Sequence, residues 1–487
     1  MPPDVAQKIL FTDRRHIAIG DLAWRGPDGQ AMPVAGPPEP AVPVQADLGG
    51  IPYGIEFRAQ RGEKLLDQAI NGPMGSRVVH EGGCYRSWAL QVRYPPGQNL
   101  GAYATAMPEA VEIAYSESAD GFSWEEKARS ALQVPGQTSF DGATFFVDPH
   151  GPPAERYKAV YMARVPAEEA GSLWRGYASL HPRYRDERIT ALRVPALYAA
   201  VSADGLGWRG VAEPLMVHYS DTDTTVRWDA WLERYVMYTR LYPHRRRIVG
   251  WAESEDFYHW TPVQPLLWPG LDRPLTDDIY LNAYSSYPGL PQYHLMFPMV
   301  YDRYAQRSHV ELWSSPDGLH WDPLPGGPLA EPGVRGAWDS EFIGVGRDLV
   351  PLGSDRVAVP YWGTPFPHKY PRWPHVLGAG RRTWLQWERD RLVALQAAGA
   401  GTFSTDPLPV AGTGLCVNAR VPRAGCLRIG LAGVEGRLVE ECDPITGDGY
   451  VLPVTWKGQP QVRVPPGTPV SLRVELRGAE VFALEWT

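Results

Sequence analysis

The chain has 487 residues, of which 44% are hydrophobic and 21% are charged, so it is long enough for more than one buried core and is not disordered. Its formal net charge is -8, and no run of Lys or Arg is longer than residues 245–247, so we expect no nucleic-acid partner. The sequence shows neither a basic segment with an apolar run at its start nor a stretch that could span a bilayer. We therefore expect no membrane association and a cytoplasmic protein, or a secreted one if a signal peptide has been trimmed.

The composition favours an all-β fold. Fifty glycines and 49 prolines, together with 19 Trp and 24 Tyr, are typical of short strands that are joined by shaped turns. Residues 1–71 form a Pro-rich lead-in, which we expect to pack on the domain that follows it.

From residue 72 onward, one pattern of strands recurs. The first unit has strands at 76–79, 84–90 and 111–120, and the second has strands at 139–148, 156–164 and 197–204, with an insertion over 165–193. Further units follow with strands at 221–229, 234–240 and 247–256, then 278–288, 293–301 and 308–317, then 338–347, 356–363 and 382–395.

A short motif marks the outer turn of four of these units. It reads Ser-x-Asp, then mostly Gly, then two residues and Trp, and predicts a strand end, a tight turn and the start of the next strand. Its copies cover residues 118–124, 202–208, 254–260 and 315–321. Five four-stranded units predict a five-bladed β-propeller over 72–400. Shorter strands at 414–419, 426–430, 461–464 and 470–476 predict a β-sandwich over 401–487.

The order of strands in such a unit predicts where a site lies. The first strand of an antiparallel unit begins, and the second strand ends, at the same mouth of the central channel. The carboxylates at those strand starts are Asp141, Asp221, either Asp277 or Asp278, and Asp339 or Glu341. The side chains expected around them as substrate-binding residues are Trp88, Arg164, Arg240, Asp278, Tyr280, Trp338, Asp339, Tyr361 and His368.

A ring of carboxylates with aromatic side chains is typical of glycoside hydrolysis. One carboxylate attacks the anomeric carbon or activates water, a second donates a proton to the leaving oxygen, and the cationic transition state needs a further negative charge. We assign Asp141 as base or nucleophile, Asp221 as transition-state stabiliser and Glu341 as general acid, because the longer Glu side chain reaches further than Asp339. Taken singly, each Asp could also be only a turn residue.

Several segments resemble the five-bladed β-propeller glycoside hydrolases, the group that contains families 32, 43, 62, 68 and 117. The resemblance rests on the repeated motif, on residues 140–149 with 156–158, on residues 220–222 with 234–240, and on the sandwich after the propeller. It implies an oligosaccharide or glycoside substrate, with an arabinofuranoside or fructofuranoside linkage foremost. The chain departs from the family plan because its first unit has no clear carboxylate and its third unit offers Asp instead of Glu.

Two other functions remain open at this point. A glycoside phosphorylase would use Arg164, Arg240 and residues 245–247 as a phosphate site, and a carbohydrate-binding propeller would have no catalysis. We expect no required cofactor, with a structural Ca²⁺ in the channel as an alternative in which His218 and Asp221 could take part. The sequence leaves the oligomeric state and the choice between retention and inversion open.

Overall fold

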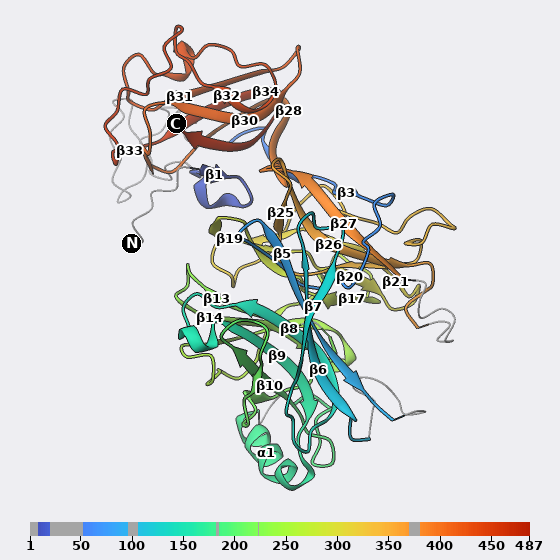
Figure 1. Ribbon diagram of the computed structural model, residues 1–487. Coiled ribbons are helices and arrows are strands. Elements are labelled where there is room, and N and C mark those ends of the chain that lie inside the picture. Colours follow the sequence, from blue (N-terminus) through green and yellow to red (C-terminus); the bar gives the residue numbers. More distant parts are fainter. Residues whose placement is uncertain (1–7, 20–51, 96–105, 182–184, 223, 370–379) are drawn as a thin grey trace, which may run out of the picture. The chain divides into compact units, whose positions relative to one another are not determined.

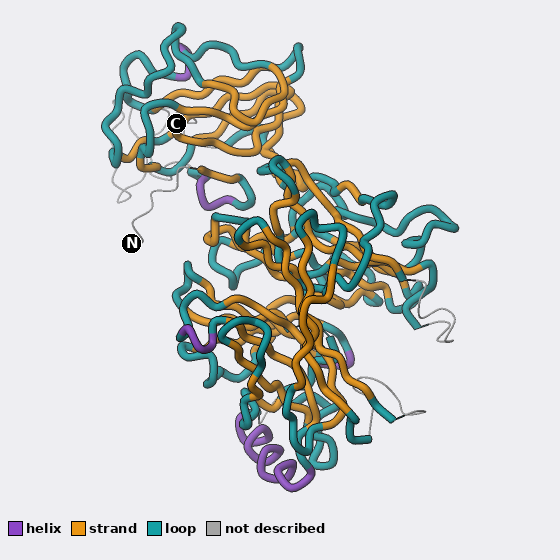
Figure 2. The backbone as a smooth tube through the Cα atoms, in the orientation of Figure 1, coloured by secondary structure: helices purple, strands orange, loops and turns teal. Residues whose placement is uncertain are grey.

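The computed structural model describes residues 8–19, 52–95, 106–181, 185–222, 224–369 and 380–487. Strands and turns dominate these residues (Figure 1, Figure 2), so the mostly β composition expected from the sequence is confirmed. The described helical segments are α1 (Ala167–Leu180) and the 3-10 turns η1 (Arg14–His16), η3 (Pro153–Glu155), η4 (Pro243–Arg245) and η6 (Val439–Glu441). No helix within the described ranges is long and apolar enough to cross a membrane.

The chain divides into two compact units. One unit contains residues 61–323 and 327–389, and the other contains residues 1–60, 324–326 and 390–487. The sequence placed the corresponding boundaries at 71/72 and 400/401. The difference arises because a short strand at residues 63–64 belongs to the first of these units, whereas a long strand that begins at Val393 belongs to the other.

The larger unit begins with three sheets, each of which pairs strands in chain order. The first contains β4 (Val78–Glu81), β5 (Cys84–Arg93), β6 (Ala110–Ser118) and β7 (Glu125–Ala131). The second contains β8 (Thr138–Val147), β9 (Tyr157–Arg164), β10 (Pro195–Ser202) and β11 (Arg209–Gly210), with β12 (Met216–Val217) also paired to β10. The third contains β13 (Thr225–Asp229), β14 (Arg234–Leu241), β15 (Ile248–Ser254) and β16 (Gln264–Leu267). The strands predicted for these three units are thus present.

The fourth set of strands is interrupted halfway along. One part pairs β17 (Asp277–Leu281), β20 (Met299–Asp302) and β21 (Arg307–Val310), and the other pairs β18 (Tyr284–Tyr287), β19 (Leu290–Met296), β22 (Trp313–Ser315) and β23 (Asp322–Pro323). Pro298 lies between β19 and β20 and has no N–H to donate, while Ala283 between β17 and β18 has a φ of 42°. These two residues explain why each predicted strand is split here.

The fifth sheet takes its last strand from the beginning of the chain. It pairs β24 (Phe342–Val345) and β25 (Val350–Leu352) with β26 (Arg356–Thr364), then β27 (Arg381–Glu388), then β3 (Glu63–Lys64). The single strand predicted over 382–395 is wrong. A turn with Asp390 at a φ of 64° ends β27, and the following strand pairs in a different sheet.

The repeated motif forms the same hydrogen-bonded turn in each copy. In the second sheet, Gly205 N–H donates to Ser202 Oγ at 2.9 Å, Leu206 N–H donates to Asp204 Oδ1 at 2.8 Å, and Trp208 Nε1 donates to the Gly205 carbonyl at 3.1 Å. That carbonyl also accepts from a neighbouring sheet, since Trp88 Nε1 in β5 donates to it at 2.7 Å. The motif therefore connects sheets to one another.

Matching bonds join other pairs of sheets. Trp384 Nε1 of β27 donates to the Gly121 carbonyl in the first sheet at 2.9 Å, and Tyr238 Oη of β14 donates to the Gly318 carbonyl in the fourth at 2.9 Å. Buried apolar clusters lie between the first and second, second and third, third and fourth, fourth and fifth, and fifth and first sheets. The five sets of strands therefore contact one another in cyclic order.

One cavity lies where these five sets of strands meet. Its volume is about 250 Å³. Each set contributes a residue in or next to its first strand: Ser76, Gly142, Thr222, Leu281 and Val345. In addition, Arg77 and Arg347 form a parallel bridge between the first and fifth sets. The first strands thus approach one another at this cavity, but not all by their starts, since Leu281 and Val345 are the last residues of β17 and β24.

The smaller unit is a β structure built around one long strand. β34 (Leu472–Trp486) pairs with β28 (Val393–Ser404), β30 (Leu415–Val421), β31 (Cys426–Leu431) and β1 (Lys8–Leu10), while β2 (Glu56–Ala59) pairs with β28 and β32 (Gly447–Pro453) with β30. β29 (Leu408–Pro409) and β33 (Pro469–Val470) form a separate pair. The strand predicted at 461–464 is absent, since Arg463 has a φ of 57° there. Residues 1–7 and 20–51 of the predicted lead-in lie outside the described residues.

Candidate functional site

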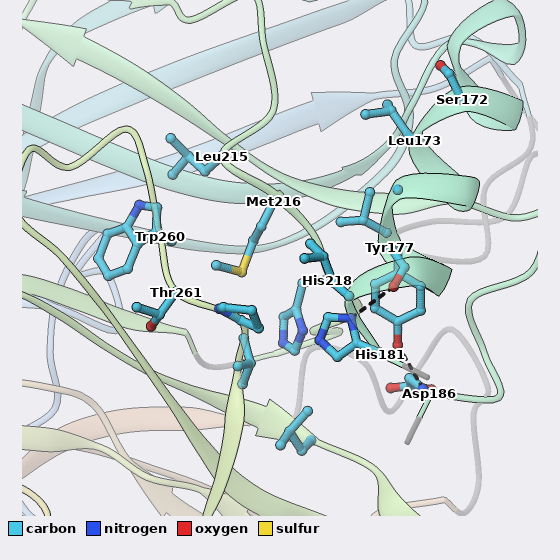
Figure 3. Close-up of a pocket in the computed structure, with 16 residues that line it drawn as sticks. Ser172, Leu173, Tyr177, His181, Asp186, Leu215, Met216, His218, Trp260 and Thr261 are labelled. Atoms are coloured by element: carbon cyan, nitrogen blue, oxygen red, sulfur yellow. Dashed lines mark hydrogen bonds between the residues drawn. The ribbon is translucent and has the colours of Figure 1, made fainter. Parts of the chain in front are cut away.

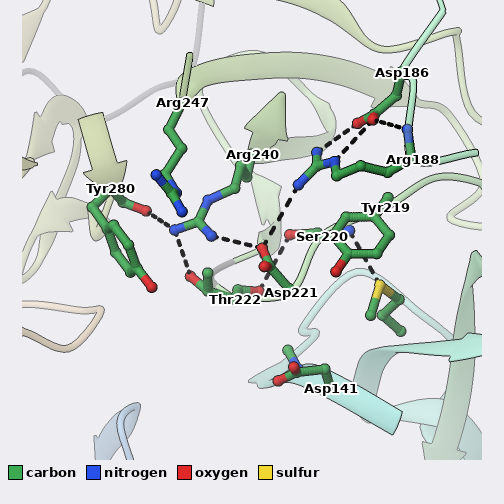
Figure 4. Close-up of polar contacts among 12 residues, drawn as sticks. Asp141, Asp186, Arg188, Tyr219, Ser220, Asp221, Thr222, Arg240, Arg247 and Tyr280 are labelled. Atoms are coloured by element: carbon green, nitrogen blue, oxygen red, sulfur yellow. Dashed lines mark hydrogen bonds and ion pairs between the residues drawn. The ribbon is translucent and has the colours of Figure 1, made fainter. Parts of the chain in front are cut away.

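Asp141 and Asp221 lie on neighbouring turns of the second and third sheets. The β8–β9 pairing shifts register on both sides of Asp141, so the strand bulges at this residue. Gly142 follows with a φ of +58°, and a Cβ atom there would lie 2.5 Å from the Thr222 carbonyl oxygen and 2.9 Å from that of Ser220. Only glycine permits this close approach. The structure thus brings together the turns that carry the two carboxylates (Figure 4).

Asp221 is held in its ionised form by two arginines. Its Oδ1 accepts a hydrogen bond from Arg240 Nη1 at 2.6 Å, and Arg188 Nη1 lies 4.0 Å away. Burial by itself would raise the pKa of this carboxyl group, but the charges of Arg240 and Arg188 outweigh it, so the pKa lies below its ordinary value. A carboxylate in this state can stabilise positive charge and is a poor proton donor.

Arg240 connects the third sheet to the fourth. It projects from β14, is 3% exposed, and donates through Nη2 to the Tyr280 carbonyl at 2.5 Å. Its guanidinium also lies over the Tyr280 ring, 4.2 Å from the centroid. Figure 4 shows Arg240 between Asp221 and Tyr280. This arginine therefore fixes the position of Asp221 and is not free to act as a mobile anion receptor.

The insertion of the second unit supplies a residue that the sequence did not single out. Arg188 donates to Asp186 from Nε at 2.8 Å and from Nη2 at 2.5 Å. Its guanidinium lies 4.1 Å from the Tyr219 ring centroid and 4.5 Å from that of Tyr242. Only the tertiary structure shows that Arg188 of this insertion lies close to Asp221.

Asp278 is an ion-paired structural residue. It is fully buried, and its Oδ2 lies 2.8 Å from Arg247 Nη1 and 3.5 Å from Arg303 Nε. Its Oδ1 accepts from the Arg247 N–H at 3.1 Å. Two cations therefore compensate this carboxylate, and a substrate has no access to it in this arrangement.

Of the two acids on the fifth sheet, Glu341 is the one that solvent reaches. Asp339 is fully buried, accepts from Tyr361 Oη at 2.7 Å and pairs with Lys64 Nζ at 2.6 Å. Burial, together with Asp339, raises the pKa of the Tyr361 hydroxyl. Glu341 retains 29% of its side-chain exposure and lies 3.1 Å from Arg307 Nε. The Trp338 ring is 5.9 Å from the Tyr361 ring, next to this pair.

His368 belongs to an aromatic cluster between the fourth and fifth sheets. Its Nε2 lies 2.9 Å from Tyr280 Oη, and its Nδ1 lies 3.2 Å from Tyr301 Oη. The imidazole also stacks on Phe342, with ring centroids 4.5 Å apart. Tyr280 thus joins His368 on one side to Arg240 on the other, which connects the predicted fourth- and fifth-sheet residues with the Asp221 turn.

The Trp88 side chain does not line the channel. Its indole is 5% exposed, packs against Tyr115 and Tyr157, and donates to the Gly205 carbonyl. Sequence analysis placed it among the substrate-binding residues because its strand ends near the channel. The side chain instead fills the core between the first and second sheets, where no sugar can stack on it.

The charged side chains where the five sets of strands meet are mostly arginines, which bears on the Ca²⁺ suggested by the sequence. Ca²⁺ takes six to eight oxygen ligands, most of them carboxylate or carbonyl. In the described parts of the chain, no group of three or more His, Cys, Asp or Glu residues could hold a metal ion. Two buried arginines, Arg77 and Arg347, and the partly exposed Arg227 lie near Asp348, which forms ion pairs with Arg77 and Arg227. This charge distribution disfavours a cation.

His218 is a buried neutral group. It is 4% exposed, and its Nε2 lies 3.0 Å from Thr239 Oγ1. Burial lowers its pKa to about 4, so the imidazole carries no charge at neutral pH. No hydrogen bond or ion pair joins it to Asp221 within the described residues, and their sharing of a channel cation stays a prediction.

A second cavity lies beneath α1 (Figure 3). It has a volume of about 380 Å³, and its walls include Leu173 and Tyr177 of the helix, Met216, and Trp260. His218 and Asp186 supply polar groups to it. Because Asp186 also binds Arg188, this cavity shares one wall residue with the network that reaches Asp221.

No protein-family model and no curated protein matches the sequence. Solved structures that the chain is similar to include an N-acetylgalactosamine deacetylase from F. plautii in complex with blood group B trisaccharide (TM-score 0.41, 14% identity, 69% of this chain and 96% of that chain). They also include a GH32 β-fructofuranosidase from Bombyx mori (TM-score 0.39, 11% identity, 90% and 95%) and a thermostable family-43 glycoside hydrolase (TM-score 0.40, 13% identity, 67% and 96%). The family-32 and family-43 enzymes among these structures agree, at low identity, with the resemblance noted from the sequence.

Proposed function

We propose that this chain is a five-bladed β-propeller glycoside hydrolase that cleaves a furanoside bond of the arabinofuranoside or fructofuranoside type. The observation that supports the proposal is the close approach of Gly142, the residue after Asp141, to the carbonyl oxygens of Ser220 and Thr222, the two neighbours of Asp221. The cyclic order of the five sets of strands and the cavity at their meeting point support the propeller.

The different surroundings of the acids suggest different roles. Asp221 is held ionised by Arg240 and supports the positive charge that develops on the sugar. Asp141, whose Oδ1 accepts from the Gly142 N–H at 2.9 Å, acts as base or nucleophile. Glu341, partly exposed beside Arg307, donates the proton to the leaving oxygen. Water then completes hydrolysis.

The test is a turnover assay on a panel of aryl arabinofuranosides and fructofuranosides. We expect Asp141→Asn and Glu341→Gln to lower kcat by about a hundredfold or more, because each removes a proton-transfer or nucleophilic group. The matched control is Asp67→Asn, which changes an exposed carboxylate. If the wild-type protein binds these sugars but never turns them over, it is a carbohydrate-binding propeller and the enzyme proposal fails.

A second candidate, a glycoside phosphorylase, is favoured by one observation. The site carries more arginines than carboxylates, and Arg164 is among those with no ion pair in the described chain. A phosphorylase uses phosphate in place of water. If turnover disappears on removal of phosphate and returns on its addition, phosphorolysis replaces hydrolysis as the function; phosphate-independent turnover eliminates it.

A further inference from the structure

Two arginines, Arg164 and Arg193, lie at the same end of the second sheet, where β9 ends and β10 begins. Arg164 is the last residue of β9 and lies opposite Pro195 of β10, and the Val165 N–H donates to the Val194 carbonyl at 3.0 Å. Arg193 precedes Pro195 by two residues. Because side chains two residues apart lie on the same face of an extended segment, the two guanidinium groups project from one side of the sheet.

These arginines lack the carboxylate partner that Arg188, Arg240 and Arg247 each have. The Nε atoms of Arg164 and Arg193 are buried and have no hydrogen-bond partner within the described residues, and no carboxylate in that part of the chain forms an ion pair with either side chain. Arg193 has one polar contact, from Nη2 to Tyr219 Oη at 3.4 Å. Burial and the nearby charge of Arg193 lower the pKa of Arg164. Half-buried cations without a counter-charge are unfavourable, and an anion would relieve this.

The arginines that the sequence nominated for an anion site are already engaged. Arg240 binds Asp221, Arg245 lies 3.2 Å from Glu187, and Arg247 binds Asp278. Arg246 donates to the Asp277 carbonyl at 2.8 Å. Of the arginines in that set, only Arg164 has no such contact within the described residues. The structure shows that Arg193 lies near it.

The Arg164–Arg193 pair is connected to the candidate site through Tyr219. The Tyr219 ring lies 5.1 Å from the Arg193 guanidinium and 4.1 Å from that of Arg188, which in turn reaches Asp221. In the β8–β9 ladder, Met162, two residues before Arg164, pairs with Asp141. Met162 Sδ also accepts from the Ser220 N–H at 3.2 Å. A group bound at the pair would therefore lie beside both candidate carboxylates.

We propose that Arg164 and Arg193 form an oxyanion subsite next to Asp141 and Asp221. Its ligand is either a carboxylate carried by the sugar substrate or free inorganic phosphate; both offer the coplanar oxygen pairs that guanidinium groups bind. The role of this subsite in substrate recognition rests on the proposed function, but its affinity for an oxyanion does not.

The experiment measures binding without turnover, by titration calorimetry of the full chain. The probes are sodium phosphate and sodium galacturonate, with arabinose as the neutral sugar and sodium chloride at matched ionic strength. We expect phosphate or galacturonate, but neither arabinose nor chloride, to bind the wild-type protein. Arg164→Gln and Arg193→Gln should each weaken this binding by about tenfold or more, the loss expected for a hydrogen bond to a charged group. Arg245→Gln, which changes a 77% exposed guanidinium, is the matched control and should bind as the wild type does.

The two sources of the oxyanion are separated by which probe binds. Phosphate binding together with phosphate-dependent turnover identifies free phosphate, whereas galacturonate binding identifies a carboxylate on the substrate. The proposal is overturned if neither probe binds more tightly than chloride, or if both arginine variants bind as the wild type does.

The melting temperature of each variant shows whether a loss of binding comes from misfolding. Because each substitution removes repulsion between two cations, Arg164→Gln should melt no lower than the wild type at low ionic strength. A lower melting temperature that salt does not change would count against an uncompensated pair. Failure of furanoside hydrolysis would leave these binding results intact, so the two proposals can fail separately.

Discussion

Arg240 Nη1 and Asp221 Oδ1 lie 2.6 Å apart, and this contact joins the start of the third sheet's first strand to the end of its second. The arginine is almost fully buried, whereas the carboxylate keeps 21% of its side-chain exposure. The pair thus holds an ionised, partly exposed carboxylate against a buried cation.

Asp221→Asn should destabilise the protein at neutral pH. The substitution leaves the buried guanidinium of Arg240 without its counter-charge, and we expect a loss of about 2 kcal/mol in the free energy of unfolding. Urea unfolding at pH 7 measures this loss, with Asp67→Asn as an exposed control.

The same variant gives a prediction for pH. The pKa of Asp221 is lowered in the folded protein, so its contribution to stability is complete above its unfolded pKa of about 4 and is lost as pH falls through the folded pKa. The difference between wild type and Asp221→Asn should therefore be constant from pH 7 to pH 5 and shrink below pH 4. A difference that is unchanged at pH 3 would contradict the ion pair.

Lys64→Met tests the attachment of β3 to the fifth sheet. Lys64 Nζ pairs at 2.6 Å with Asp339, which is fully buried, so the substitution leaves a buried carboxylate without its counter-charge. We expect a loss of about 3 kcal/mol, because an uncompensated buried charge is costly. The control is Lys127→Met, which removes only an exposed pair with Glu125. Equal stability of the two variants would show that the Lys64 contact contributes little.

Gly205→Ala tests the repeated turn. Gly205 has a φ of +77°, and a Cβ atom there would lie 3.1 Å from the Trp88 ring and 3.2 Å from that of Tyr157. We expect the backbone strain and the crowding to cost about 1–3 kcal/mol in the free energy of unfolding. Gly207 lies two residues further along the same turn and has open space around its Cβ position. Gly207→Ala should therefore leave the free energy of unfolding nearly unchanged. Thermal unfolding of both variants makes the comparison.

His218→Gln should make the protein less sensitive to mild acid. In the folded chain the pKa of His218 is lowered to about 4. Between pH 6.5 and pH 4 the unfolded chain therefore takes up a proton that the folded chain does not, and the wild type loses up to about 3 kcal/mol of stability over this range. Glutamine does not titrate, so the variant should lose less over the same range.

The matched control for that experiment is His244→Gln, because the His244 side chain is exposed. Its pH dependence should follow that of the wild type. Parallel stability curves for wild type and His218→Gln between pH 7 and pH 4.5 would show that His218 is not held neutral in the folded protein.

Much of the strand order could be predicted because the information is local. Alternating apolar residues and the turn residues of the repeated motif act within a few positions of one another, as the Ser202, Asp204 and Trp208 bonds show. The strand predicted over 382–395 failed because β27 and β28 are both rich in strand-forming residues, and only their different partners separate them.

The amino-acid sequence by itself determined the β character of this protein and the repeated turns, since periodicity and turn chemistry depend on adjacent residues. Only the tertiary structure decided that Trp88 is a core residue, that Asp278 and Asp339 are buried ion-pair partners, and that Arg188 and Arg193 of the insertion lie by the site. Charge compensation and burial depend on which distant segments meet, and spacing along the chain does not contain that information.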